Sequence, residues 1–339
     1  MTPKSNRIEH PSGITVETPL LVPSFSSKGF TFKKNNISEI VDVLLMSQEF
    51  LTASALISAY DLYHEHIPFT EQILGTELTI LDSGGYETSD IYDLSSTSKY
   101  SFPIKDWSQN KYEQIITKWP AHKAGIIVSY DHGAERHDLD FQINQAKELF
   151  SKYENFLNDF LIKPETDDQR YIQISSVLSK INDLKDFSII GMTEKELGNS
   201  ILDRMVHIAK IRKALDSVGN KAPLHIFGSL DPVSSLLYFF AGAEIFDGLT
   251  WLKYSYFNGS AIYQSNYGVL NSELGIHLRD SQVRSKSIVN NIYTLEKMTY
   301  LMNNFVSSSD FKVFSELDKG LPVYLEKSVE TFLNRLNRN

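Results

Sequence analysis

Three aspartates follow short apolar stretches at separate places in the chain. Asp82 follows LTIL, Asp131 follows GIIVSY and Asp247 follows EIF. A carboxylate at the end of a buried strand is costly unless it is partnered or used in chemistry. Each aspartate taken alone is explained as a helix cap or a turn residue. Three aspartates at equivalent positions indicate an acidic pocket instead, because the catalytic residues of a barrel lie at the carboxyl ends of its strands.

Paired carboxylates suit chemistry at an anomeric carbon. One can attack the carbon while the other handles the proton of the leaving or the incoming group. The pair Gly84 and Gly85, directly after the first aspartate, would let a flat ligand approach the backbone closely. The same SGG sequence is also typical of a simple tight turn.

Eight short apolar runs predict the strands that must position these residues. The expected strands lie at 19–25, 41–47, 78–83, 125–131, 171–176, 187–193, 224–229 and 244–249. Helical patterns lie between several of them, and apolar residues at spacings of three and four predict a helix over 201–215. Asp231 and Pro232 are typical of a helix start, and Gly242 of its end.

Strands that alternate with helices imply parallel pairing with right-handed crossovers. Eight such units predict a single (β/α)8 TIM-type barrel that spans residues 1–339. A doubly wound open sheet is the structural alternative. The polar, Ser-rich segment 88–110 is expected to be a loop over the barrel mouth, and residues 285–339 are expected to form a helical region.

The composition indicates a globular protein, with 42% apolar and 22% charged residues in 339. The sequence has no cysteine, which excludes disulfides, thiolate metal sites and a cysteine nucleophile. It has no signal-peptide pattern and no apolar run that would span a membrane, so we expect a cytoplasmic protein without membrane contact. The net charge of -9 counts against a broad basic surface for nucleic acid.

An ordered set of motifs over residues 15–305 resembles the queuine/archaeosine tRNA-guanine transglycosylase family. LDSGGYE resembles the Asp-Ser-Gly-Gly-aromatic-Gln signature of that family, and VSYD resembles the strand that carries its base-recognition aspartate. YIQISS resembles its Val-Gln-Gly strand, and IIGMTEKE its Gly-Gly-Leu-x-x-Gly-Glu stretch. PLHIFGSLDPVSSLLYFFAGAEIFDG resembles the segment that ends in Gly-x-Asp-x-Phe-Asp.

The resemblance implies a (β/α)8 barrel that exchanges guanine for a 7-deazaguanine through a covalent aspartyl intermediate. It assigns Asp247 as the nucleophile and Asp82 as the general acid and base. The remaining residues that it places around the base are Asp131, Gln173, Gly191 and Met192 at the base edge, Tyr86 and Phe227 on the two ring faces, and Ser83, Gly228 and Glu196 nearby. It implies no cofactor.

The chain departs from the tRNA enzymes where they hold zinc. They use a cysteine cluster and a later histidine, whereas this chain has no cysteine and the histidine position corresponds to Asn290. The stretch 267–282 resembles a shortened replacement for the zinc subdomain. We therefore expect no metal and no zinc subdomain.

A second departure concerns the nucleic acid. The family's Pro-Thr-Arg-x-x-Arg-Asn-Gly sequence corresponds here to TWLKYSYFNG, so Lys253 and Tyr256 replace two arginines while Asn258 is kept. Lysine neutralises a phosphate but cannot make the planar bidentate contact of arginine. We expect these three residues to contact nucleic acid.

These departures favour the branch of the family that modifies DNA. The expected substrates are DNA and 7-cyano-7-deazaguanine or a relative, with a helper protein that opens the duplex as a further possible partner. The alternatives are a divergent enzyme that acts on tRNA, a non-catalytic partner subunit and an ordinary glycoside hydrolase.

Overall fold

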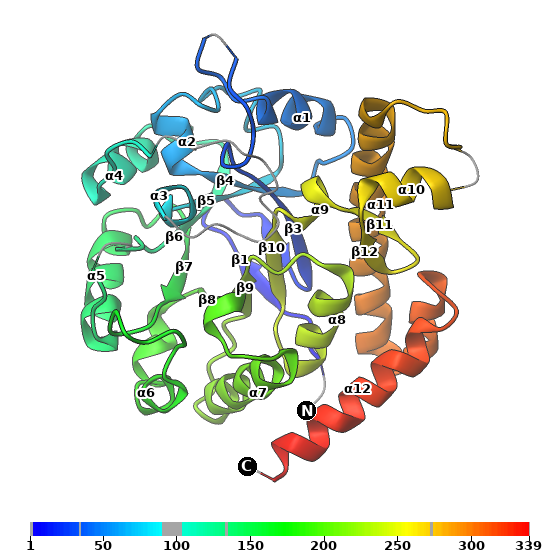
Figure 1. The fold of residues 1–339 in the computed structure, drawn as a ribbon. Helices are drawn as coiled ribbons and strands as arrows, with labels where there is room; N and C mark the ends of the chain where they lie inside the picture. Colours follow the sequence, from blue (N-terminus) through cyan, green and yellow to red (C-terminus); the bar gives the residue numbers. More distant parts are fainter. Residues whose placement is uncertain (1–2, 34, 90–103, 133–134, 272–273, 339) are drawn as a thin grey trace.

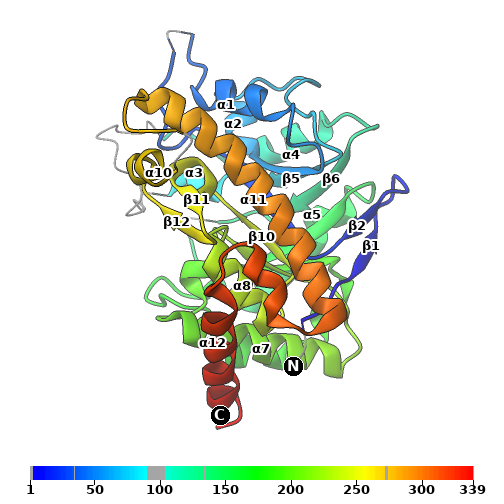
Figure 2. The ribbon, with the colours of Figure 1, turned by 90° about the vertical axis from the view of Figure 1, so that its right-hand side faces the viewer.

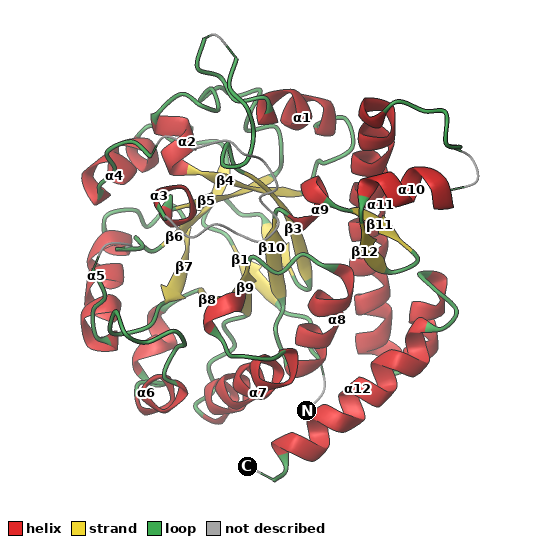
Figure 3. Ribbon diagram, in the orientation of Figure 1, coloured by secondary structure: helices red, strands yellow, loops and turns green. Residues whose placement is uncertain are grey.

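Eight parallel strands form a closed barrel inside a ring of helices (Figures 1 and 3). The computed structural model describes residues 3–33, 35–89, 104–132, 135–271 and 274–338. The neighbours around the barrel run β10-β3-β4-β5-β6-β7-β8-β9 and back to β10. The strands are β3 Leu20–Phe25, β4 Ser54–Ser58, β5 Leu78–Asp82, β6 Ala124–Val128, β7 Leu157–Ile162, β8 Ile189–Thr193, β9 Leu224–Phe227 and β10 Ile245–Gly248. The predicted (β/α)8 architecture is confirmed, and the open sheet is wrong.

Two of the eight expected strands are wrong. The stretch 41–47 lies in α1 (Ile40–Ser47), where Ile40, Val41 and Leu44 are buried at helical spacing. In the stretch 171–176, residues 171–173 are a loop and residues 174–176 begin α6 (Ile174–Ser179). The strands at these places in the order are β4 and β7, whose sequences SALIS and LNDFLI interrupt the apolar pattern with polar residues.

The other helices follow the strands around the outside of the barrel. They are α2 Ala59–Tyr63, α3 Gly85–Thr88, α4 Gln109–Thr117, α5 Leu139–Ser151, α7 Ile201–Ser217 and α8 Pro232–Ala241, with short 3-10 turns at Asp183–Asp186 and Glu194–Glu196. The Asp231 side chain accepts hydrogen bonds from Val233 N and Ser234 N at the start of α8, and Gly242 ends it at φ 105°. These termini confirm the expected helix signals. Most of the expected loop over the mouth, residues 90–103, lies outside the described residues.

The interior of the barrel changes from apolar to polar along its axis. Inward-facing residues near the amino ends of the strands, among them Leu78, Leu157 and Ile189, form one buried apolar cluster. The hairpin of β1 (Arg7–Glu9) and β2 (Thr15–Glu17) covers that end, with Val16 packed into the same cluster. Because side chains alternate along a strand, every second residue faces inward. The polar inward residues are Ser24, Ser58, Asp82, Asp159, His225 and Asp247, and they lie beside apolar ones such as Val128 and Leu161.

The chain after the barrel forms a helical region on one side of it (Figure 2). It contains α9 Thr250–Lys253, the hairpin of β11 Ser255–Phe257 and β12 Ser260–Ile262, α10 Gln264–Leu270, α11 Asp280–Ser308, a 3-10 turn at Phe311–Glu316 and α12 Leu321–Leu336. The expected helical character of 285–339 is therefore confirmed over its described residues. In the described part of the chain, no helix combines the length and the apolar character that a membrane span requires.

Asn291 of α11 fixes the segment that follows the last barrel strand. Its amide group donates to the carbonyl oxygens of Trp251 and Tyr254, each at 2.7 Å, and its Oδ1 accepts from Tyr256 N at 2.7 Å. The side chain is fully buried. Asn291→Ala should lower the free energy of unfolding by about 2–4 kcal/mol, because it leaves buried backbone groups without partners. Urea unfolding measures this loss, and the exposed Asn303→Ala in the same helix serves as the control; equal stabilities would contradict the assignment.

Candidate active site

Asp247 lies inside β10 and is held by donors from both neighbouring strands. Ser24 Oγ of β3 donates to its Oδ2 at 2.7 Å, and Gly228 N, just after β9, donates to its Oδ1 at 3.1 Å. His225 Nε2 of β9 lies 3.3 Å from the same Oδ1. The residue is only 5% exposed. Donors on both oxygens fix the orientation of the carboxylate and offset the cost of burying it.

Asp82, at the end of β5, has a poorer set of donors. Its Oδ2 accepts one hydrogen bond from Gly84 N at 3.0 Å. Burial raises the pKa of this carboxyl group to about 6, and the negative charges of Asp247 and Asp131 act in the same direction. The structure therefore brings the three predicted aspartates into one electrostatically coupled site. Asp82 exchanges a proton close to neutral pH, which suits a general acid and base.

The two glycines after Asp82 allow close packing at the start of α3. Gly84 adopts φ 90°, and a Cβ there would lie 2.8 Å from the Cβ of Tyr60. At Gly85 a Cβ would lie 2.6 Å from Asp131 Oδ2. The SGG sequence is thus a tight turn whose second glycine makes room for the third aspartate. Ser83, which precedes the two glycines, lies beside the third aspartate, since its Oγ accepts from Asp131 N at 3.2 Å.

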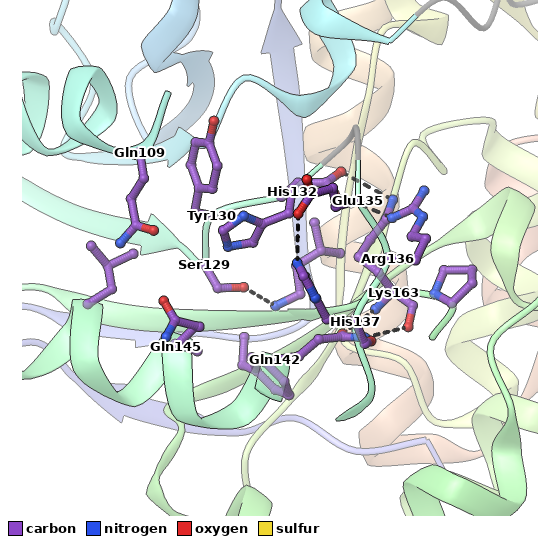
Figure 4. Close-up of a pocket in the computed structure, with 16 residues that line it drawn as sticks. Gln109, Ser129, Tyr130, His132, Glu135, Arg136, His137, Gln142, Gln145 and Lys163 are labelled. Carbon is purple, nitrogen blue, oxygen red and sulfur yellow. Dashed lines mark hydrogen bonds and ion pairs between the residues drawn. The ribbon is translucent and has the colours of Figure 1, made fainter. Parts of the chain in front are cut away.

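Asp131 and Glu196 share two cations, Arg136 and Lys163. Both cations line the pocket drawn in Figure 4. Lys163 Nζ lies 3.3 Å from Asp131 Oδ2 and 2.8 Å from Glu196 Oε2. Arg136 bridges the same carboxylates at 3.5 Å each. Burial disfavours the charge on Lys163, but Asp131 and Glu196 outweigh it and raise the pKa of the lysine. The cluster therefore offers an ammonium donor beside a carboxylate acceptor at one edge of the site.

Two residues predicted to read the base lie inside β8, and a third lies in a loop. Gly191 and Met192 pair with β7 and β9, and Met192 is fully buried. Gln173 is not on a strand as expected, because it is an exposed residue that precedes α6. Its neighbour Ile172 donates its backbone N–H to the carbonyl of Glu196 at 2.9 Å, so the loop borders the site. Their contacts with a base stay predictions.

The two aromatic residues expected to sandwich a base have different surroundings. Phe227 is 8% exposed and its ring lies on the imidazole of His225, with centroids 3.8 Å apart. Tyr86 is half-buried, with Lys28 Nζ 4.7 Å from its ring centroid. Phe227 therefore contributes to the wall of the site, and the sandwich stays a prediction.

Three residues were predicted to contact nucleic acid, and for one of them, Tyr256, the prediction is wrong. Tyr256 is 1% exposed, and its hydroxyl donates to the carbonyl oxygen of Leu230, so its ring has no free face. Asn258 is exposed at φ 50° in the turn between β11 and β12, and Lys253 is half-buried at the end of α9.

At the position of the family's zinc histidine, Asn290 donates to Tyr256 O at 2.8 Å. No group of three or more histidines or acidic residues in the described chain is arranged to hold a metal ion.

Sequence reasoning missed several residues that shape the site. They are Ser24, Glu87, Arg136, Asp159, Lys163 and His225. Asp159 and Lys163 were missed with their strand, because β7 lacks a continuous apolar run. Their signal lies in the alternation of β7, where Leu157, Asp159 and Leu161 share one face. In β9 the same alternation places His225 on the face of Phe227.

No protein-family model matches the sequence, and no curated protein matches it.

Glu87 of α3 gives a test of the electrostatics of this site. Ser58 Oγ donates to its Oε2 at 2.6 Å, and Ser26 Oγ donates to its Oε1. Burial raises the pKa of Glu87 from 4.5 to about 8, and the charges of Asp61 and Asp82 add to the effect. Between these two values the folded protein holds a proton that the unfolded chain lacks. Stability therefore falls as pH rises from 4.5 to 8.

Glu87→Gln should remove this loss. Relative to wild type, the variant should gain stability by up to ~1.4 kcal/mol per pH unit across the window and level off above it. Urea unfolding at pH 5, 7 and 9 measures the difference. The exposed Glu326→Gln is the matched control and should follow wild type. A constant difference between Glu87→Gln and wild type would show that Glu87 keeps an ordinary pKa.

Proposed function

We propose that this protein is a transglycosylase that exchanges guanine in DNA for a 7-deazaguanine, such as 7-cyano-7-deazaguanine. The observation that carries the proposal is the electrostatic interaction of Asp82 and Asp247, two strand-end carboxylates in unlike surroundings. Asp247 accepts two hydrogen bonds and lies 3.3 Å from the imidazole of His225, whereas burial and two negative charges raise the pKa of Asp82 to about 6. One carboxylate is thereby prepared to attack and the other to carry a proton.

The reaction proceeds by two displacements at the ribose C1′. A carboxylate oxygen of Asp247 forms a bond to C1′ while the bond to guanine N9 breaks, and the leaving guanine takes a proton from Asp82. The incoming base then gives its N9 proton to Asp82 and attacks C1′, which releases Asp247. Two inversions leave the configuration at C1′ unchanged.

The charge cluster supplies the chemistry that a guanine edge requires. Asp131 is an acceptor for the two N–H groups on that edge, and Lys163 beside it is a donor for the carbonyl oxygen. An adenine edge carries an amino group in place of the carbonyl and would face the ammonium with a donor. This complementarity supports guanine and its 7-deaza relatives over other bases.

DNA is preferred over tRNA because of what the chain has lost relative to the tRNA enzymes. It has no cysteine for zinc, and Lys253 stands where an arginine would grip the anticodon loop. The target nucleotide must leave its stack to reach the barrel mouth, so a helper protein that opens the duplex is part of the proposal. Retention of both catalytic carboxylates supports an active enzyme over a non-catalytic partner subunit.

The proposal is tested by base exchange and by trapping the intermediate. Wild-type protein should incorporate labelled guanine into single-stranded or duplex DNA and form a denaturation-resistant adduct with it. Asp247→Asn should abolish both, because the amide cannot attack C1′. Adducts are counted on denaturing gels.

The matched control is Asp186→Asn. Asp186 is an exposed aspartate paired with Lys147 before β8, at the opposite end of the barrel, and its loss should leave adduct formation unchanged. Label incorporated into tRNA but not into DNA would overturn the choice of nucleic acid. An adduct formed by Asp247→Asn would overturn the assignment of the nucleophile.

The pKa of Asp82 predicts the pH dependence of the first displacement. Guanine leaves with the proton of Asp82, so single-turnover adduct formation should fall about tenfold per pH unit above pH 6. Asp82→Asn should form adduct on the order of 10²–10⁴-fold more slowly and lose this limb of the profile. Rapid-quench measurements from pH 5 to 8.5 decide between these outcomes. If the rate of adduct formation by the wild-type protein does not begin to fall near pH 6, Asp82 is not the general acid.

A further inference from the structure

A fully buried pair of charged side chains lies directly behind Asp247. His225 Nδ1 is 2.6 Å from Asp159 Oδ2, and His225 Nε2 is 3.3 Å from Asp247 Oδ1. Asp159 and His225 are both fully inaccessible to solvent. The imidazole therefore lies between the carboxylate of Asp159, which is inaccessible to solvent, and that of Asp247, which is 5% exposed.

The surrounding strands are built to admit this pair. Asp159, His225 and Asp247 face inward from β7, β9 and β10, and β8 separates the first two with a glycine. A Cβ at Gly191 would lie 2.7 Å from Asp159 Oδ1 and 2.4 Å from the ring of Phe227. That ring lies against the imidazole, with centroids 3.8 Å apart and a tilt of 30° between the ring planes. Any larger residue at position 191 would displace the pair.

The contacts favour a cationic imidazole. Burial alone would lower the pKa of His225, but Asp159 and then Asp247 outweigh it and raise the pKa to about 9. Both ring nitrogens can then donate, one to each carboxylate. The charged groups that face His225 are these two aspartates, from β7 and β10; the other neighbours, Gly191 and Phe227, carry no charge.

We propose that Asp159 and His225 are positioning residues that hold a positive charge against the nucleophile Asp247. This inference rests on the proposed function. The contact between His225 and Asp247 fixes the position of Oδ1 during the attack on C1′. Its larger effect is on the rate of the second displacement. There the bond between C1′ and Asp247 breaks and its electron pair returns to the carboxylate. His225 stabilises the departing negative charge and keeps its own proton.

A purely structural role predicts a different set of kinetic effects. A buried polar pair that only completes the core would change stability, and any damage to the site would slow both displacements alike. A charge held on the leaving carboxylate affects chiefly the discharge of the adduct. The two displacements are separated by trapping the adduct first and adding the incoming base afterwards.

The kinetic test uses three variants of the pair and one control. Asp159→Asn keeps the shape of the side chain but removes the charge that holds His225 cationic. Discharge of the adduct should slow at least about tenfold more than its formation, so that adduct accumulates. His225→Gln keeps a donor toward Asp247 without a charge, and it should form adduct faster than His225→Leu while discharging it slowly. His207→Gln is the control, since His207 of α7 contacts the backbone carbonyl of Leu197 and should behave as wild type. Thermal unfolding of each variant verifies that it is folded.

A second measurement needs no activity. The pKa of His225 is followed by NMR on the wild-type protein, with its signal assigned from its absence in His225→Gln. It should titrate near pH 9, and both Asp159→Asn and Asp247→Asn should lower that value. A His225 that is neutral at pH 7, or that ignores the loss of Asp247, overturns the inference, and so do equal effects on formation and discharge. A wild-type protein that forms no adduct overturns the proposed function instead, while the titration still decides whether His225 holds a charge against Asp247.

Discussion

The placement of buried carboxylates at one end of the barrel is the constraint on which the site depends. Asp82, Asp159 and Asp247 face inward where a barrel of this kind normally packs apolar side chains. Burying a charge is tolerated only when partners offset the lost hydration. The neighbouring strands supply those partners unequally. The serine of β3 and the histidine of β9 serve Asp247, whereas Asp82 receives one backbone donor and two negative neighbours.

This inequality divides two chemically identical side chains into different roles. A carboxylate rich in donors is oriented and charge-compensated, which suits attack on carbon and departure from it. A carboxylate poor in donors binds a proton near neutral pH, which suits proton transfer. Glu87 extends the pattern, because burial raises its pKa to about 8 and it then behaves as a neutral hydrogen-bonding group behind Asp82. The environment, rather than the residue type, assigns the chemistry.

The sequence predicted the barrel and its three acidic strand ends because both depend on local patterns. Short apolar runs that end in aspartate are visible at β5, β6 and β10. It failed at β4 and β7, whose polar inward residues break the apolar run, and it thereby missed Asp159 and Lys163. It also expected Tyr256 at a ligand surface, although the tyrosine packs under α11. Pairings such as His225 with Asp159 join distant positions and cannot be predicted from local pattern.

The glycines of the site show how little space remains for a base in this conformation. At Gly85 the missing side chain is replaced by the carboxylate of Asp131, and at Gly191 by Asp159 and the ring of Phe227. A base read by the β8 backbone would therefore need the Phe227 ring to turn away from His225. A base that binds Asp131 and Lys163 would only have to break the ion pair between them and replace it with its own hydrogen bonds to the two side chains. Since the second change disturbs no packed ring, the charge cluster is the better candidate for the first contact with the base.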